Sequence, residues 1–168
     1  MDLAVYGVLC GRREEREAAY RLLAYGLERE AGAVPRLERA PGGKPFFPER
    51  PDLQFNLSHS RGAAVCALHS QSVGVDVERL RPAPRRLARG MEDEAFFRLW
   101  TAKEATIKRQ GRGVEALLGP LEPDPRCRLL DEFLPGWVVT VCPGQDIPVR
   151  TVRVAWDELL EGRFAIYL

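Results

Sequence analysis

Short apolar segments of strand length recur through the sequence and alternate with longer helical patterns. The strand-like segments lie at residues 3–9, 33–39, 53–57, 63–68, 73–78, 127–130, 136–142 and 149–155. Apolar runs of this length, bounded by Gly, Pro and polar residues, are typical of strands. Residues 14–30 and 92–110 instead have the apolar spacing of amphipathic helices; WDELLE at 156–161 predicts a short helix, and RFAIYL at 163–168 follows it. The order of segments therefore predicts a mixed α/β chain.

Length and composition limit the classes of protein to consider. The 168 residues suffice for one domain or a compact pair of half-domains. With 45% hydrophobic and 29% charged residues, the chain is neither disordered nor a coiled coil. Lys and Arg exceed Asp and Glu by one, so no nucleic-acid or membrane partner is expected, and a charged partner needs a local patch. The sequence shows no secretory signal or membrane span, and we expect a cytoplasmic protein.

A weak internal repeat has an offset of 76 residues. Val-Cys at 65–66 recurs at 141–142, and Val73 recurs as Val149. The repeat predicts two stacked half-domains with pseudo-twofold symmetry, although three identities also fit a chance likeness of two hairpins.

The cysteines do not form a metal-binding pattern. They stand alone at Cys10, Cys66, Cys127 and Cys142, with no Cys-x-x-Cys pair, and the chain has two histidines, His59 and His69. This spacing argues against a structural zinc site and favours buried free thiols in a reducing compartment.

Two acidic residues end the apolar strand at 73–78. In a strand, residues i and i+2 point to the same face, so the carboxylates of Asp76 and Glu78 are expected to lie side by side. Paired carboxylates repel unless a cation lies between them, and hard oxygen ligands suit Mg²⁺. The alternative is a strand that enters solvent with acids on its polar face.

The helix at 92–110 carries a third acid next to a cation. Glu104 and Lys108 lie one turn apart, beside an apolar stripe that includes Phe96 and Trp100. The pair could serve a site that binds a metal ion and a phosphate. It could equally be a surface ion pair worth about 0.2–0.5 kcal/mol.

Two polar segments could contact phosphate. Ser58-His59-Ser60 follows the strand at 53–57 as a predicted turn, whose hydroxyls and N–H groups could hold an anion. Lys44, in Gly-Gly-Lys-Pro at 42–45, could meet a phosphate as a point charge. A capped turn and a flexible loop are the alternatives. The absence of a Gly-x-Ser-x-Gly motif argues against a serine hydrolase.

Taken together, the order and spacing of these motifs resemble one family. GGKP, FNLSHS, VGVDVE and FFRLWTAKEATIKRQGRG are similar to the successive motifs of the 4′-phosphopantetheinyl transferases of the surfactin-synthetase-activating (Sfp) type. The likeness runs from about Val34 through Leu160. It implies an α/β (α+β) fold of two pseudo-symmetric half-domains, here 1–72 and 73–168, each a small, mainly antiparallel sheet with a packed helix.

The resemblance also implies a reaction and a set of residues. The enzyme would transfer 4′-phosphopantetheine from coenzyme A to a serine of an apo acyl or peptidyl carrier protein, releasing 3′,5′-ADP, with Mg²⁺ or Mn²⁺. Asp76, Glu78 and Glu104 would be the metal ligands, with Glu104 also the general base. Lys108 would meet the diphosphate. Lys44, Ser58 and His59 would help to bind coenzyme A.

The chain departs from the family pattern in two places. The part before GGKP and the part between Arg79 and Leu99 are shorter than usual. As a result, no residue in a matched motif can be assigned to binding the 3′-phosphate of coenzyme A. The second segment is strongly basic, with arginines that we expect to rim the site and dock an acidic carrier protein; these are Arg79, Arg81, Arg85, Arg86 and Arg89. A solvated basic loop is the alternative.

A chain with both half-domains needs no partner to complete the site, so a monomer is expected. Two other functions stay open. One is a coenzyme A-binding homologue with weak or no transfer, and the other is a Mg²⁺-dependent phosphotransferase that uses another nucleotide.

Overall fold

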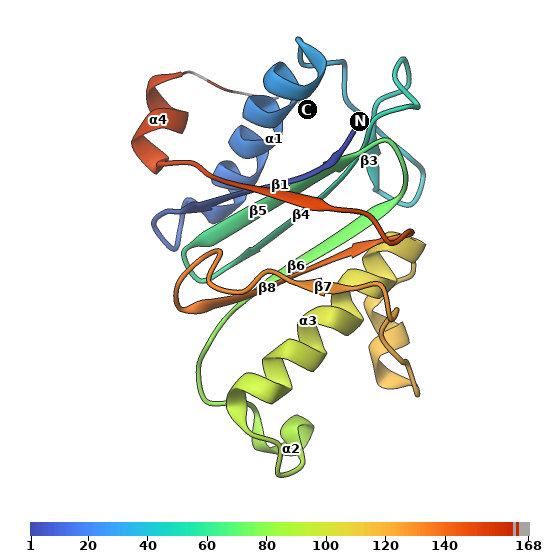
Figure 1. Cartoon of the computed structure of the whole chain (residues 1–168), viewed down its shortest axis with the longest axis vertical. Coiled ribbons are helices and arrows are strands. Elements are labelled where there is room, and N and C mark those ends of the chain that lie inside the picture. The colour runs from blue at the N-terminus through green and yellow to red at the C-terminus, as the bar shows by residue number, and fades with distance from the viewer. Residues whose placement is uncertain (163, 165–168) are drawn as a thin grey trace.

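In the computed structural model, which describes residues 1–162 and 164, the chain is a mixed α/β fold with three sheets (Figure 1). The strands are Leu3–Leu9 (β1), Glu38–Arg39 (β2), Pro45–Phe46 (β3), Gln54–Ser60 (β4), Ala63–His69 (β5), Val73–Arg79 (β6), Arg128–Leu129 (β7), Trp137–Pro143 (β8) and Val149–Arg153 (β9). The helices are Glu15–Ala31 (α1), Arg85–Ala88 (α2), Asp93–Gln110 (α3) and Trp156–Glu161 (α4), with a 3₁₀ helix at Val114–Leu118 (η1). None of the described helices is both long and apolar enough to span a bilayer.

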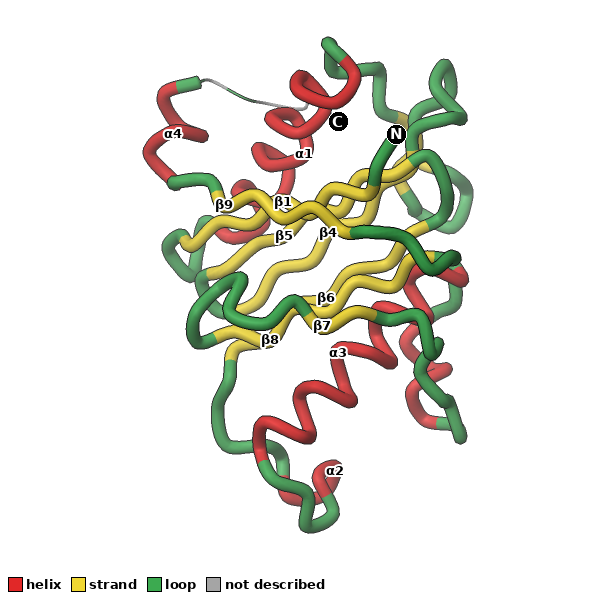
Figure 2. The backbone as a smooth tube through the Cα atoms, in the orientation of Figure 1, coloured by secondary structure: helices red, strands yellow, loops and turns green. Residues whose placement is uncertain are grey.

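The two larger sheets lie edge to edge between layers of helix (Figure 2). The first has the order β4-β5-β1-β9, antiparallel except for the parallel pair β1–β9. The second has the order β6-β8-β7 and is antiparallel throughout. Helices α1 and α4 lie on one side of this arrangement and α3 on the other (Figure 1). The third sheet is the two-stranded pair β2–β3.

Strand periodicity explains how the sheets are packed. Tyr6 and Val8 of β1 point into a core with Leu22 and Leu23 of α1. The alternate residues of β1 and β5 point the other way, into a second core that they share with β6 and β8; its members include Leu3, Val5, Val65, Val75 and Val141. This second core joins the two sheets.

Most predicted elements are present, but β4 is longer than predicted. Residues 58–60, interpreted from the sequence as a turn, continue the strand: Ser58 pairs with Val65 and Ser60 with Ala63. The turn consists of Arg61 and Gly62, whose φ angles are 48° and 104°. Positive φ at both central residues is typical of a tight hairpin turn that matches the strand twist.

The basic segment and three short strands also differ from the prediction. Pro84 keeps the extended conformation that proline favours, but the arginines that follow it form the four-residue helix α2 in place of a loop. The strand predicted at 33–39 is reduced to Glu38–Arg39, and its partner Pro45–Phe46 lies in a predicted loop. The strand at 127–130 is confined to β7. Except for Phe164, the last predicted segment, 163–168, lies outside the described residues.

One sheet crosses the boundary predicted at residues 72 and 73. β9 pairs with β1, so a strand from 73–168 completes the sheet that the N-terminal residues begin. The next helix, α4, packs near α1, where Tyr25 Oη donates a 2.7 Å hydrogen bond to Glu158. The division into half-domains therefore does not coincide with a division between sheets.

Gly74 sets the distance between β6 and α3. A Cβ atom at this position would lie 1.9 Å from the carbonyl oxygen of Ala105 and 2.7 Å from the backbone nitrogen of Arg109. Both are backbone atoms of α3, so no side-chain rearrangement can relieve the clash. Only glycine allows this helix to lie so close to the strand.

We therefore expect Gly74→Ala to lower the free energy of unfolding by at least about 2 kcal/mol, because α3 must move away from β6. Gly42→Ala is the matched control, since no atom lies within 4 Å of its Cβ position. Its effect should stay below about 0.5 kcal/mol. Urea unfolding measures both, and equal stabilities would show that the close approach is unimportant.

Candidate active site

The alternation of β6 separates apolar from polar side chains. Val73, Val75 and Val77 point into the core between the sheets. Asp76 and Glu78 point to the other side, where Gly74 allows α3 to pack. The same-face arrangement of the two carboxylates expected from the sequence follows from this strand geometry.

Asp76 is a buried carboxylate, with 5% of its surface exposed. Its Oδ1 accepts hydrogen bonds from Ser58 Oγ at 2.9 Å and from Lys108 Nζ at 3.1 Å. Its Oδ2 is buried and has no hydrogen-bond partner among the described residues. Burial raises the pKa of Asp76 to about 7; the positive charge of Lys108 opposes this shift, and the negative charge of Glu104 adds to it.

Glu78 and Glu104 complete an acidic group. Oε2 of Glu78 accepts hydrogen bonds from Ser60 Oγ at 3.2 Å and from Arg81 Nη1 at 3.0 Å. Glu104 is partly buried on α3, and burial raises its pKa; Lys108 lowers it, and the charge of Glu78 raises it further. The negative charge of Glu104 thus raises the pKa of Asp76, and the negative charge of Glu78 raises the pKa of Glu104. The fold brings these three predicted residues into one electrostatic environment.

Lys108 joins the helix to both sheets. Its ammonium group donates to the carbonyl oxygens of Leu57 at 3.5 Å and Val75 at 3.0 Å, besides Asp76. An ammonium group has three N–H donors, so all three have acceptors. Lys108 must exchange at least one of these bonds to contact a phosphate.

Three alternate side chains of β4 connect it to β6. Asn56 Oδ1 accepts from the N–H of Val75 at 2.8 Å, and Ser58 Oγ accepts from the N–H of Val77 at 3.2 Å. Ser60 Oγ makes a longer bond of 3.4 Å with the N–H of Arg79. Asn56 was not predicted from the sequence, and Ser60 was predicted only as part of an anion-binding turn. The i, i+2, i+4 spacing of Asn56, Ser58 and Ser60 would have indicated a polar strand edge if the strand had been extended to residue 60.

Two other predicted residues lie elsewhere. His59 points away from Ser58 and Ser60, toward α1, where its Nδ1 lies 3.2 Å from Glu15 Oε1. Lys44 lies in the exposed turn between β2 and β3. Among the described residues, neither side chain forms a hydrogen bond or ion pair with Asp76, Glu78 or Glu104.

The basic segment follows directly after Glu78. Arg79 stacks on Trp137 at 5.1 Å, and Arg81 lies 4.5 Å above the ring of Phe97 besides contacting Glu78. The guanidinium groups of Arg85, Arg86 and Arg89 form no ion pair with any described residue. The segment therefore contains two arginines that pack on aromatic rings and three whose guanidinium groups have no ion-pair partner among the described residues.

The donor set suits a hard divalent cation. Residues 1–162 and 164 contain no group of three or more His, Cys, Asp or Glu side chains already arranged to hold a metal ion. In this structure Asp76 and Glu78 instead pair with Lys108 and Arg81. Oδ2 of Asp76 is buried and has no hydrogen-bond partner among the described residues, so it is an oxygen atom that could coordinate a cation. Two further carboxylates share its environment, and oxygen donors of this kind bind Mg²⁺.

A comparison with known families decides the relationship. A family model of the 4′-phosphopantetheinyl transferase superfamily matches residues 72–133, which contain β6 and α3. The chain belongs to the 4′-phosphopantetheinyl transferase superfamily. The predicted resemblance is thereby confirmed, and the matched segment contains all three acids and Lys108.

Curated members of the superfamily are similar over much of the chain. The 4′-phosphopantetheinyl transferase Sfp of Bacillus subtilis is 29% identical over 151 aligned positions, which cover 70% of this chain and 67% of Sfp. HetI of Nostoc is 36% identical over 141 positions, covering 67% of this chain and 57% of HetI. AcpT of Salmonella typhi is 36% identical over 104 positions, covering 51% and 54%. The matches thus span about two thirds or less of these relatives' own length.

The raised pKa of Asp76 predicts how stability depends on pH when metal is chelated. Its folded-state pKa of about 7 exceeds the unfolded value of about 3.9, so the unfolded chain loses this proton first as pH rises. The protonated group stabilises the fold at low pH, and this contribution is lost as pH rises to about 7 and above. The side chain introduced by Asp76→Asn has no proton to lose in this pH range. The unfolding free energy of Asp76→Asn, measured relative to that of wild type, should therefore rise by about 2–3 kcal/mol between about pH 5 and 8.

Chemical denaturation in EDTA at several pH values measures this difference. Asp131→Asn, an exposed aspartate on a loop, is the control and should track wild type. Parallel curves for wild type and Asp76→Asn would contradict the buried, protonated carboxylate.

Proposed function

We propose that this protein is a holo-carrier-protein synthase. It transfers 4′-phosphopantetheine from coenzyme A to a serine hydroxyl of an apo acyl or peptidyl carrier protein and releases 3′,5′-ADP. The observation that carries the proposal is the convergence of Asp76, Glu78, Glu104 and Lys108 within the segment that the family model matches. Relatives named as 4′-phosphopantetheinyl transferases support the reaction class.

In this proposal each residue has a distinct task. Asp76, Glu78 and Glu104 would hold Mg²⁺, or Mn²⁺ in its place. When bound, the metal ion would supply positive charge that neutralises the diphosphate of coenzyme A. Glu104 accepts the serine proton, and its raised pKa brings it closer to the pKa that suits a general base near neutral pH.

Side chains of the protein then contact the phosphates of coenzyme A, directly or through Asp76. Lys108 turns one of its three N–H donors from a protein acceptor to the diphosphate, where charge grows in the transition state. Ser58 acts through Asp76, which it contacts directly. His59 and Lys44 lie apart from the carboxylates and are accessible to solvent, and in this proposal they contact the phosphates and nucleotide of coenzyme A.

The architecture expected from the family is part of the same proposal. The strand orders β4-β5-β1 and β7-β8-β6, each with a helix on its outer side, support two pseudo-symmetric half-domains near 1–72 and 73–168, with β9 of the second half added to the sheet of the first. A chain with both halves would act as a cytoplasmic monomer.

Carrier docking is proposed for the basic segment. Arg86, Arg89 and Lys103 border a groove of about 620 Å³ whose apolar lining includes Leu87 and Met91. Leu87 is 55% exposed and Met91 40%, so apolar surface is available beside unpaired cations. An acidic amphipathic helix of a carrier protein matches this surface in charge and polarity.

The contacts of Lys108 and Arg81 favour a second candidate, a coenzyme A-binding homologue without transfer activity. In this structure they occupy two of the three carboxylates. A phosphotransferase that uses another nucleotide would share the same acids. Mass spectrometry of an apo carrier protein incubated with coenzyme A and Mg²⁺ separates these functions, because only a synthase adds the phosphopantetheine mass to the carrier.

The same assay tests Glu104. We expect Glu104→Gln to bind coenzyme A but to lower the transfer rate by about 10²-fold or more, the scale of a lost general base. Glu122→Gln, an exposed acid outside the site, is the matched control and should act like wild type. Transfer by Glu104→Gln at the wild-type rate would remove Glu104 from the proposed mechanism.

The docking surface is tested by charge reversal. Arg85→Glu with Arg86→Glu should raise the KM for the carrier about tenfold or more at low salt, because it repels an acidic partner. The defect should shrink as salt screens the charges over about 8 Å. The double variant Arg16→Glu with Arg153→Glu carries the same charge change on exposed sites elsewhere. Equal loss in both double variants would indicate a general charge effect, and a parallel fall in coenzyme A affinity would indicate a phosphate grip.

A further inference from the structure

Two cysteines far apart in the sequence lie opposite each other in the second sheet. In the antiparallel pair β7–β8, Arg128 faces Val141 and Leu129 faces Thr140. The next step of the same register places Cys127 opposite Cys142. Sequence analysis did not predict this pairing, because β7, the connecting turn and most of β8 lie between the two cysteines.

The alternation of backbone hydrogen bonds along β7 and β8 shows whether Cys127 and Cys142 form a hydrogen-bonded or a non-hydrogen-bonded pair. Leu130, opposite Val139, donates its N–H to the Val139 carbonyl at 2.9 Å, which is the pattern of a hydrogen-bonded pair. Antiparallel pairs alternate, so Cys127 and Cys142 occupy a non-hydrogen-bonded position. The Cα atoms of such a pair lie about 4.5 Å apart, within the range of about 4.4–6.8 Å that a disulfide needs.

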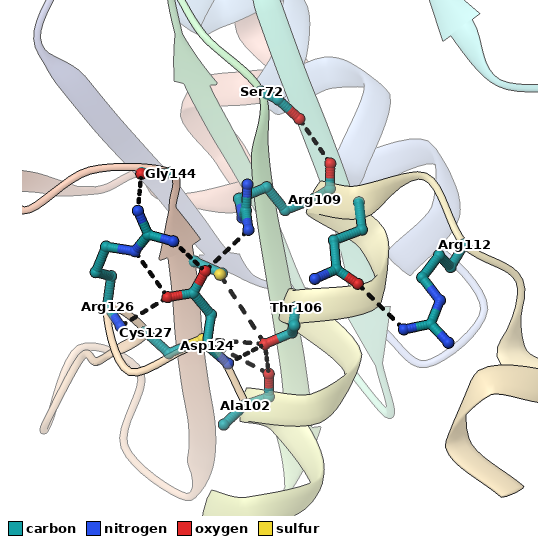
Figure 3. Close-up of polar contacts among 11 residues, drawn as sticks. Ser72, Ala102, Thr106, Arg109, Arg112, Asp124, Arg126, Cys127 and Gly144 are labelled. Atoms are coloured by element: carbon teal, nitrogen blue, oxygen red, sulfur yellow. Dashed lines mark hydrogen bonds and ion pairs between the residues drawn. The ribbon is translucent and has the colours of Figure 1, made fainter. Parts of the chain in front are cut away.

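The two sulfur atoms also share one neighbour on α3. Thr106 Oγ1 lies 3.4 Å from Cys127 Sγ and 4.0 Å from Cys142 Sγ. Figure 3 shows Thr106 and Cys127 pointing toward each other, with Ala102 on the same side of the helix. Both cysteine side chains therefore point to the α3 side of the sheet. Cys142 is buried, whereas Cys127 is partly exposed and leaves the pair a route to solvent.

The neighbouring side chains lower the pKa of Cys142. The hydrogen bond from Cys127 lowers the pKa of Cys142 to about 7; burial opposes this shift, and the guanidinium of Arg109 adds to it. The pKa of Cys127 is raised, first by the same hydrogen bond and then by burial. Asp124 would repel a thiolate, but it pairs with Arg109 at 2.8 Å and with Arg126 at 2.9 Å (Figure 3).

We propose that Cys127 and Cys142 form a dithiol site that a peroxide oxidises to a reversible disulfide. The thiolate of Cys142 attacks one oxygen of hydrogen peroxide, the O–O bond breaks, and hydroxide leaves with a sulfenic acid formed on the protein. Cys127 then attacks that sulfur and displaces a second hydroxide. The two thiol protons convert both hydroxides to water, so two thiols are oxidised by two electrons and one peroxide is reduced.

This modification is independent of the proposed transfer reaction. The disulfide would close the segment 127–142 and fasten β7 to β8 beneath α3, the helix that carries Glu104. It thus adds a covalent bond next to a short two-residue strand that backbone hydrogen bonds alone hold only weakly.

Peptide mapping of the full-length wild-type protein tests the proposal. The protein is treated with hydrogen peroxide, its remaining thiols are alkylated, and it is digested without reduction. We expect a cross-linked peptide containing Cys127 and Cys142, lighter by two hydrogen atoms than the separate peptides, which dithiothreitol splits. The oxidised protein should unfold about 5 °C or more above the reduced one.

Two variants serve as controls. Cys142→Ser should lose both the cross-link and the thermal shift, whereas Cys10→Ser, which removes a partly exposed thiol elsewhere, should keep both. Because the mapping uses the wild-type chain, the test does not depend on the folding of a variant. The proposal is wrong if Cys127 and Cys142 remain open to alkylation or stop at separate sulfinic acids. Cross-links through Cys10 or Cys66 in place of this pair would also overturn it.

Discussion

β4 and β6 are the edge strands at which the two larger sheets meet, and side chains make the join between them. The position of the acidic residues depends on this join. Each sheet would otherwise leave an edge strand with unpaired backbone groups in the interior, which is costly. Asn56 and Ser58 accept the N–H groups of Val75 and Val77, and Lys108 donates to carbonyl oxygens of both strands. A net gain of about 0.5–1.5 kcal/mol per bond is modest, but together the bonds fix the register of β6 against β4. That register places Asp76 beside Ser58.

The same join explains how a buried carboxylate is tolerated. An isolated charge away from water is strongly destabilising, so buried acids are paired or protonated. Asp76 combines both solutions: it accepts hydrogen bonds from Ser58 and Lys108, and its pKa is raised toward neutrality. Lys108 thus belongs to the structure of the fold as well as to the proposed chemistry. Its removal should therefore be examined for stability before any loss of turnover is assigned to phosphate binding.

Local pattern was sufficient for part of the site. The alternation in Val-Gly-Val-Asp-Val-Glu predicted that Asp76 and Glu78 share a face, because strand geometry alone decides it. The helix ends at Gln110 because Gly111, with φ of 68°, takes the left-handed conformation that glycine adopts readily at helix C-termini. By contrast, Ser58-His59-Ser60 was interpreted as a turn, since small polar residues favour turns when no partner strand is known.

Other features depend on packing that a sequence does not contain. The contact of Lys108 with Leu57 and Val75 requires α3 to cross the join, which Gly74 permits only once the helix is packed. The proximity of Cys127 and Cys142 follows from the register of two strands, of which one is only two residues long. A short strand has almost no pattern of its own, and tertiary contacts decide its limits.

The parallel pairing of β9 with β1 has a consequence for synthesis on the ribosome. β9 begins 140 residues after β1 ends, so one edge of β1 has no partner until all of this intervening segment has been made. An unpaired apolar strand edge is prone to pair with another chain. Contacts between such distant segments also slow folding, because a long loop must close before they form. The nascent chain therefore carries an aggregation-prone edge until β9 has been made and covers it.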